Sequence, residues 1–197
     1  MKDLASVTGE QIANIGSQDM NNEVWIRLAR RVNELQARPD VTGIVITHGT
    51  DTMEETGYFL DLVVKGDKAV VLVGSMRPAT AISADGPMNL YNATAVAVDP
   101  AAKGRGVLAV RNDDVHFASE TTKTNTTSLQ TFHSPNRGLA EIVLFGRARF
   151  DSPPALKRSM RASLSASFQL PSVFRMAADI LCGNAQTICH AGATERA

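Results

Sequence analysis

The amino-acid sequence predicts an α/β fold in which a mostly parallel sheet is flanked by helices. Three short apolar runs, residues 43–47, 69–73 and 106–110, are rich in β-branched side chains and have the composition of strands buried on both faces. Helical patterns separate them, and strands that alternate with helices form parallel sheets through right-handed crossovers. With 197 residues, of which 44% are hydrophobic, the chain is long enough to bury one good core.

The predicted helices follow from the spacing of apolar residues. From Asn22 onward apolar residues recur three or four positions apart, opposite a charged face. The second helix is expected to open at Thr52, with Glu55 completing a capping box, and a third to cover residues 88–98. The apolar positions of the first two helices are Val24, Trp25, Leu28, Val32 and Leu35, then Tyr58, Phe59 and Leu62.

The two ends of the chain carry weaker signals. Residues 1–18 are mixed and polar, and they are expected to end in a loop at Gly16. Residues 142–150 favour a hairpin with its turn near Gly146. Residues 151–172 are basic and serine-rich, and we interpret them as a linker because no interleaved aromatic residues indicate a nucleic-acid patch.

Charge and composition narrow the classes of partner. Twenty basic residues balance twenty acidic ones, so no net field favours nucleic acid or an anionic membrane. No apolar run is long enough to span a bilayer, and the first residues do not begin a signal peptide. A small polar molecule is therefore the expected ligand.

No cofactor or metal is expected. The only candidate phosphate loop, Gly104-Arg105-Gly106, precedes a strand instead of following one, which disfavours a nucleotide-dependent oxidoreductase. Cys182 and Cys189 lack the paired spacing of zinc or redox motifs, and with His190 they supply too few ligands for a structural zinc site. We interpret the two cysteines as ordinary thiols.

Polar loops follow all three predicted strands, over residues 49–52, 74–80 and 111–114. The carboxyl ends of parallel strands meet at one edge of a sheet, where open α/β sheets bind ligands. We therefore expect the hydroxyl, carboxylate and backbone groups of these loops to share a single pocket.

Thr50 and Asp51 lie between the end of the first predicted strand and the start of a helix, whose backbone N–H groups favour developing negative charge. A hydroxyl beside a carboxylate at that place is a catalytic hypothesis; turn and cap residues are the alternative. Lys123 lies in a dense polar run, residues 120–127, which is either a solvated loop or a source of a base. A lysine close to Thr50 and Asp51 would support proton transfer from the hydroxyl.

Residues 44–54, Ile-Val-Ile-Thr-His-Gly-Thr-Asp-Thr-Met-Glu, closely resemble the second active-site signature of the bacterial L-asparaginase family. The resemblance extends from Met1 to about Phe150, with further motifs in family order at residues 14–19, 73–78, 83–92 and 122–127. It implies the large N-terminal α/β domain of that family over residues 1–150.

The resemblance also implies an activity and roles for residues. The family hydrolyses the side-chain amide of L-asparagine, and in some members of L-glutamine, to the acid and ammonia through a threonine nucleophile and an acyl intermediate, without a metal. Its members are homotetramers, although the resemblance does not extend to an assembly of this chain itself. The motifs are similar to those of the exported, periplasmic type; expressed as given, the chain is expected in the cytoplasm. By position, Thr50 corresponds to the second active-site threonine and acts with Lys123 and Asp51. Asp51 would also hold the substrate's α-ammonium, Ser17 and Gln18 its α-carboxylate and amino end, and Ser75 would line the amide pocket through its backbone.

The sequence departs from the family pattern at both ends. The family's first segment, with a Gly-Thr-Gly-Gly-Thr motif that carries the primary nucleophile, has no counterpart, so we expect a partial sheet with an exposed apolar face. Residues 173–197 resemble a remnant of the smaller second α/β domain. We accordingly expect impaired amidase activity; the alternative is an inactive fragment that retains amino-acid binding.

Overall fold

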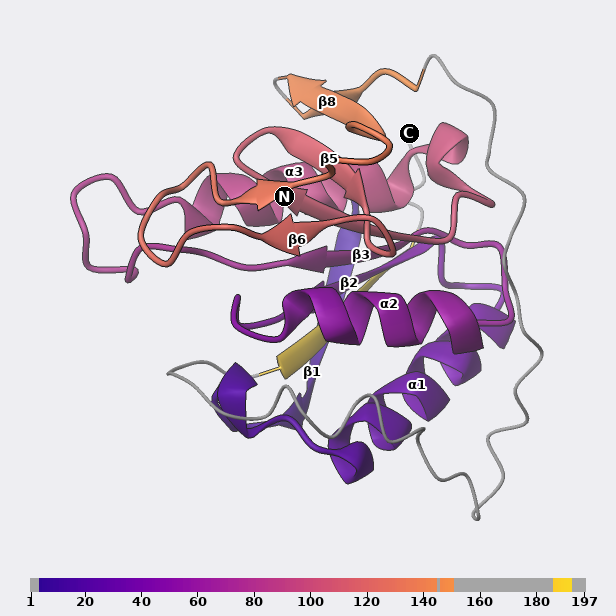
Figure 1. Ribbon diagram of the computed structural model, residues 1–197. Coiled ribbons are helices and arrows are strands. Elements are labelled where there is room, and N and C mark those ends of the chain that lie inside the picture. Colours follow the sequence, from indigo (N-terminus) through magenta and orange to yellow (C-terminus); the bar gives the residue numbers. More distant parts are fainter. Residues whose placement is uncertain (1–3, 145, 151–185, 193–197) are drawn as a thin grey trace.

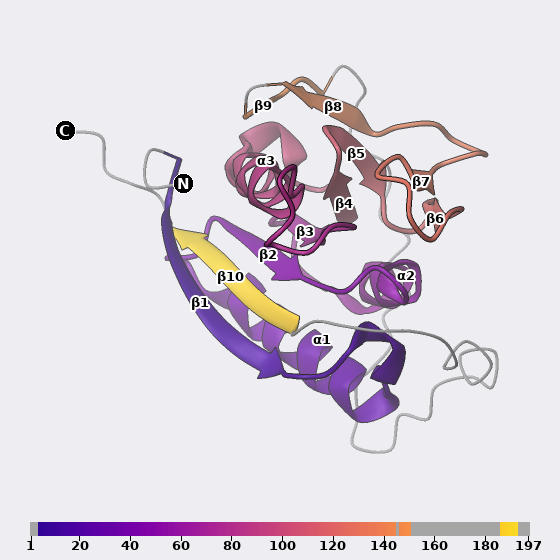
Figure 2. The same cartoon turned by 90° about the vertical axis from the view of Figure 1, so that its left-hand side faces the viewer.

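The computed structural model describes residues 4–144, 146–150 and 186–192. These residues form three layers, a central sheet with helices on both of its faces. Helices α1 (Asn22–Ala37) and α2 (Met53–Val63) cover one face, and α3 (Gly86–Val98) covers the other (Figures 1 and 2). The predicted α/β class, a sheet flanked by helices, is confirmed. None of the helices in the described part of the chain is long and apolar enough to cross a membrane.

The sheet contains eight of the described strands in the order β1-β10-β2-β3-β4-β5-β8-β9. Its centre is parallel, as predicted, because β2 pairs with β3 and β3 with β4 in the same direction; the strands on either side are antiparallel. The strands are β1 (Ser6–Ala13), β2 (Gly43–Thr47), β3 (Val70–Val73), β4 (Val107–Arg111), β5 (Asp114–Phe117), β8 (Glu141–Leu144), β9 (Arg147–Ala148) and β10 (Gln186–Gly192).

The three predicted central strands and the hairpin near Gly146 are confirmed. β2, β3 and β4 are buried along almost their whole length, as expected for strands covered on both faces. β8 and β9 pair across a turn in which Gly146 has a φ of 70°. A separate small hairpin, β6 (Thr122–Lys123) with β7 (Phe132–His133), lies beside the sheet.

The first helix packs as predicted, and the second does so in part. Every apolar position expected to be buried in α1 is buried. α2 starts after Thr52 as predicted, but the capping box is wrong: the Thr52 hydroxyl donates to another segment, and Glu55 Oε2 is buried without a hydrogen-bond partner. On the predicted apolar face of α2, Phe59 is buried and Leu62 packs against the core, but Tyr58 is 43% exposed.

β1 was not predicted, because its side chains show little apolar alternation. Most of them are exposed or half-buried, so the strand is specified by backbone pairing with β10 and not by a hydrophobic pattern.

β10 corrects two further expectations. It fills the space between β1 and β2, so the sheet in the described residues is continuous and its expected exposed apolar face is absent: Ile44, Ile46 and Ile188 are all fully buried. Residues 186–192 therefore lie in the first domain's sheet and not in a remnant of a second domain. The open backbone groups of β1 and β2 provide the physical reason, because unpaired strand edges accept another strand. Residues 151–185, with the predicted linker and Cys182, lie outside the described residues, so the division of the chain there stays a prediction.

Candidate active site

The turn between β2 and α2 holds Thr50 and Asp51, and Ser17 stabilises it through two hydrogen bonds. The backbone N–H of Asp51 donates to Ser17 Oγ at 3.2 Å, and the Thr52 hydroxyl donates to the Ser17 carbonyl at 2.7 Å. Ser17 is completely buried. A Cβ at Gly49 would lie 2.4 Å from Ser17 Oγ, so only glycine lets the two segments approach this closely.

The β6–β7 hairpin brings Lys123 onto this turn. Lys123 Nζ lies 2.9 Å from Thr50 Oγ1 and 2.7 Å from Asp51 Oδ1. The side chains of Lys123 and Asp51 are only 15% and 18% exposed, so the ion pair is partly screened from water. A hydroxyl, an amine and a carboxylate thus form one hydrogen-bonded set, which is the arrangement that activates a hydroxyl for nucleophilic attack.

Glu54 is a residue that sequence reasoning missed. Its Oε2 accepts a hydrogen bond from the backbone N–H of Lys123 at 2.5 Å and so fixes the hairpin to the first turn of α2. An acidic residue in a first helical turn has an ordinary explanation in the helix dipole. The sequence therefore gave no signal of a partner so far along the chain.

Ser75 lies at the same edge of the sheet, because the preceding residue Gly74 packs against the Thr50 turn. A Cβ at Gly74 would lie 2.4 Å from the His48 carbonyl oxygen and 3.5 Å from Thr50 Cγ2, so the loop after β3 lies against the Thr50 turn. Asp85 shapes this loop, because its carboxylate accepts the backbone N–H groups of Met76 and Arg77, each at 2.9 Å. Gln18 lies next to Ser17 in the short helix Ser17–Asp19, where its amide donates to Asp19 at 3.3 Å.

His48 anchors a buried hydrogen-bond chain beneath the turn, which sequence reasoning also missed. Its Nδ1 lies 2.7 Å from the Gly49 carbonyl and therefore carries the proton, while Nε2 accepts from the Thr56 hydroxyl at 2.9 Å. The indole N–H of Trp25 donates to Thr56 Oγ1 at 2.8 Å. Burial lowers the pKa of His48 from 6.5 to about 4, so the ring is neutral at neutral pH.

Arg111, at the end of β4, is a buried cation with few compensating contacts. It is 2% exposed, lies 3.7 Å from the Asp85 carboxylate and stacks over the Phe132 ring at 4.7 Å. Its three guanidinium nitrogens make no hydrogen bond to the described residues. Burial accordingly lowers the pKa of Arg111 to about 10.

The chain matches the family model described as Asparaginase, N-terminal over residues 1–156. It belongs to the asparaginase family. Among its relatives, "Probable L-asparaginase periplasmic" of Haemophilus influenzae is 55% identical over 160 residues, which are 81% of this chain and 45% of that protein.

Two further relatives carry related names. "L-asparaginase 2" of Bacillus subtilis is 61% identical over 143 residues, 73% of this chain and 38% of that protein. "Glutaminase-asparaginase" of Pseudomonas fluorescens biotype A is 48% identical over 160 residues, 81% of this chain and 44% of that protein. The chain thus spans less than half the length of these relatives of the asparaginase family.

Of the asparaginase-type residues proposed from the sequence, the structure directly joins Thr50, Asp51, Lys123 and Ser17. It places Ser75 on the loop after β3 and Gln18 next to Ser17 in the short helix Ser17–Asp19. No group of three or more His, Cys, Asp or Glu side chains that could hold a metal ion occurs within the described residues. Cys189 is a free thiol, and burial raises its pKa.

Acidification should destabilise the protein through its buried histidines. Burial lowers the pKa of both His48 and His116 to about 4, so between pH 6.5 and 4 the unfolded chain binds protons that the folded chain does not. Each histidine should therefore remove about 2 kcal/mol from the free energy of unfolding between pH 7 and pH 5. Urea denaturation at the two pH values measures this difference. In His48→Asn, and likewise in His116→Asn, the loss of unfolding free energy between pH 7 and pH 5 should be smaller by the share of the replaced histidine. An unchanged pH difference in His48→Asn would refute the neutral, buried state of the ring.

Replacing Arg111 by methionine should destabilise the protein. Asp85 keeps its backbone and Asn89 donors, but its buried carboxylate loses the guanidinium that lies 3.7 Å away, and the stacking on Phe132 is lost. Because one partner of a buried ion pair is removed and the other stays charged, we expect Arg111→Met to lower the free energy of unfolding in urea by about 3 kcal/mol. The control is Arg27→Met on the exposed face of α1, which should change it by less than about 0.5 kcal/mol. Unchanged or increased stability in Arg111→Met would contradict the interaction of the guanidinium with Asp85.

Proposed function

We propose that this chain hydrolyses the side-chain amide of L-asparagine to L-aspartate and ammonia, with Thr50, Lys123 and Asp51 as its proton-transfer set. The observation that supports this most is the pair of contacts from Lys123 Nζ to Thr50 Oγ1 and Asp51 Oδ1. A hydroxyl, a base and a group that orients the base are the three parts that nucleophilic acyl transfer needs. The family to which the chain belongs points to the same chemistry.

The proposed reaction starts from the uncharged form of the Lys123 amine, after the ammonium has given one proton to water. A threonine oxygen then forms a bond to the amide carbon while its proton passes to this amine. The amine then gives this proton to the departing nitrogen, which leaves as ammonia as the C–N bond breaks. Water next attacks the resulting ester and passes a proton to the amine; the aspartyl group leaves as the carboxylic acid, and the threonine oxygen recovers its proton. In this chain we assign the hydroxyl to Thr50, because its oxygen lies 2.9 Å from the amine.

Substrate binding is proposed for the groups around the same turn. The Asp51 carboxylate would pair with the substrate's α-ammonium, with Ser17 and Gln18 near the α-carboxylate and the Ser75 backbone near the amide. Ser17 is completely buried, so its part is to hold the turn unless the loop opens for substrate. L-Glutamine is the second substrate candidate, since one relative is named glutaminase-asparaginase.

We propose further that this chain alone turns over asparagine slowly, because it spans less than half the length of its relatives. A periplasmic location belongs to the same proposal and is supported by the name of the Haemophilus influenzae relative. The second candidate function is amino-acid binding without hydrolysis.

The test combines ammonia release from L-asparagine with calorimetry of L-aspartate binding, both on the purified chain. Thr50→Val and Lys123→Met should each lower ammonia release by about a hundredfold or more. The controls are Thr126→Val and Lys65→Met, whose side chains are exposed and lie outside the set; they should match the parent. Asp51→Asn should abolish L-aspartate binding because the α-ammonium loses its counter-charge.

Three outcomes would overturn the proposal. Ammonia release that is unaffected by Lys123→Met would remove the assigned base. L-Aspartate binding without any ammonia release would establish the second candidate in place of the first. Turnover near that of a full-length relative would defeat the claim that this chain is impaired.

A further inference from the structure

β10 lies between β1 and β2, the two strands that precede the Ser17 segment and the Thr50 turn. It pairs antiparallel with β1 on one side and with β2 on the other, although β1 and β2 run in the same direction (Figure 2). Ile188 is completely buried and belongs to the core cluster that also contains Ile44 and Ile46 of β2. Among the described strands, β10 alone connects β1 to the rest of the sheet.

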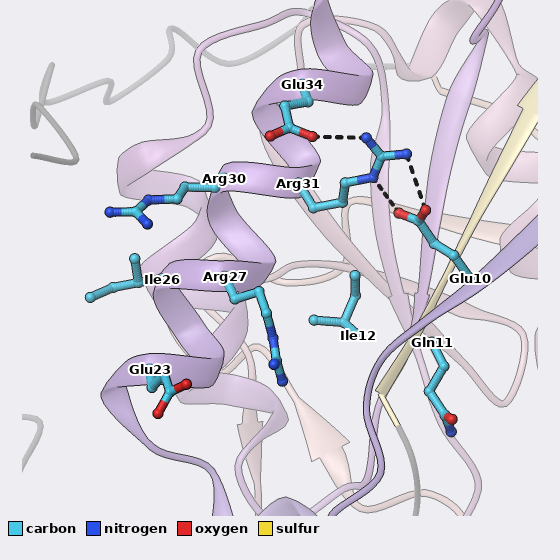
Figure 3. A pocket seen from close by; sticks show the side chains of 9 residues that line it. All are labelled: Glu10, Gln11, Ile12, Glu23, Ile26, Arg27, Arg30, Arg31 and Glu34. Atoms are coloured by element: carbon cyan, nitrogen blue, oxygen red, sulfur yellow. Dashed lines mark hydrogen bonds and ion pairs between the residues drawn. The ribbon is translucent and has the colours of Figure 1, made fainter. Parts of the chain in front are cut away.

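The attachment of β1 to helix α1 is weaker. Glu10 of β1 pairs with Arg31 of α1 at 2.5 and 3.0 Å, but their side chains are 33% and 29% exposed (Figure 3). Partly exposed pairs of this kind contribute about 1 kcal/mol or less. An open groove of about 650 Å³, lined by Ile12 of β1 and Ile26 of α1, lies next to this pair, while Ala13 at the end of β1 packs in the same core cluster as α1 (Figure 3).

β1 leads directly into the support of the Thr50 turn. It ends at Ala13, and Ser17 follows four residues later with its contacts to the Asp51 N–H and the Thr52 hydroxyl. The position of β1 therefore bears on the approach of Ser17 to the turn, beside the core contacts of Ile15 and Met20.

We infer that β10, anchored by Ile188, is a positioning strand for the candidate site: it holds β1 and through it Ser17, so that Asp51 is oriented for the substrate's α-ammonium. The effect on substrate binding rests on the proposed function. The role of β10 in holding β1 does not depend on it. Loss of β10 should weaken binding of the amino acid more than it slows the chemical step, because Lys123 contacts Thr50 from the β6–β7 hairpin, which does not pair with β1 or β10.

The register offers a direct test by disulfide formation. Gly9 and Cys189 are opposite each other in the β1–β10 pair, and a Cβ at Gly9 would lie 3.7 Å from Cys189 Sγ. In a Cys182→Ser background, Gly9→Cys should form an intramolecular disulfide with Cys189 on mild oxidation, seen as a faster monomer band on a non-reducing gel. Val7→Cys and Gln11→Cys are the register controls, because their partners on β10 are Ala191 and Thr187, and they should not crosslink.

The functional arm compares Ile188→Asn with the conservative Ile188→Val. Ile188→Asn should speed hydrogen exchange of the β1 amides and weaken L-aspartate binding about tenfold, because a misplaced contact group costs one to two orders of magnitude. KM should rise while kcat stays within about threefold of the parent. Ile188→Val should behave like the parent, and oxidation of Gly9→Cys combined with Ile188→Asn should restore binding.

The outcomes separate this inference from the proposed function. Absence of the Gly9–Cys189 crosslink, or a crosslinked dimer in its place, would overturn the assignment of β10 to its own chain's sheet. Normal L-aspartate affinity with mobile β1 amides would overturn the positioning role. If the parent binds no amino acid at all while the crosslink and the exchange pattern appear as expected, the proposed function fails and the role of the strand stands. Should Ile188→Asn not fold, L-aspartate affinity of oxidised against reduced Gly9→Cys decides: weaker binding on oxidation would contradict the inference, and equal or tighter binding supports it.

Discussion

The candidate site depends on the contact of the Lys123 amine with both Thr50 and Asp51. This contact joins a hairpin to a turn 72 and 73 residues earlier in the chain, and its atoms are separated by 2.7 and 2.9 Å. Because the pair is only partly exposed, water competes for it less than at an open surface. Without it, the hydroxyl and the carboxylate are ordinary turn residues, and no amine lies beside the threonine.

Several buried contacts keep the partners of Lys123 in place. Glu54 holds the backbone of Lys123 from the first turn of α2, and Ser17 holds the backbone of Asp51. Beneath the turn, His48 fixes the Gly49 carbonyl and is itself fixed by Thr56, which Trp25 contacts from α1. The turn is therefore supported from two helices and from the segment after β1. Such support is what keeps a catalytic group within a few tenths of an ångström of its working position.

Sequence reasoning identified the parallel centre of the sheet, α1 and the convergence of Thr50, Asp51 and Lys123, because each left a local pattern. Buried strands are apolar throughout, α1 has a clear apolar face, and the signature motif occupies one continuous segment. Glu54, His48 and Thr56 were missed because their partners lie far away in the sequence and their residue types have common local explanations. β1 and its pairing with β10 were missed for another reason: the pairing is through backbone groups, and the pattern of Ser6–Ala13 contains almost no core positions. The capping box failed because Ser17, a partner invisible to local sequence, takes the Thr52 hydroxyl.

A double-mutant cycle between Asp51 and Lys123 tests the central claim most directly. The free energy of unfolding would be measured in urea for the parent, Asp51→Asn, Lys123→Met and the double variant at pH 7. The structure predicts a favourable coupling of about 0.5–3 kcal/mol, so the double variant should lose less than the two single variants together. Strictly additive losses would mean that the amine and the carboxylate do not interact in solution, and the proposed proton-transfer set would be untenable.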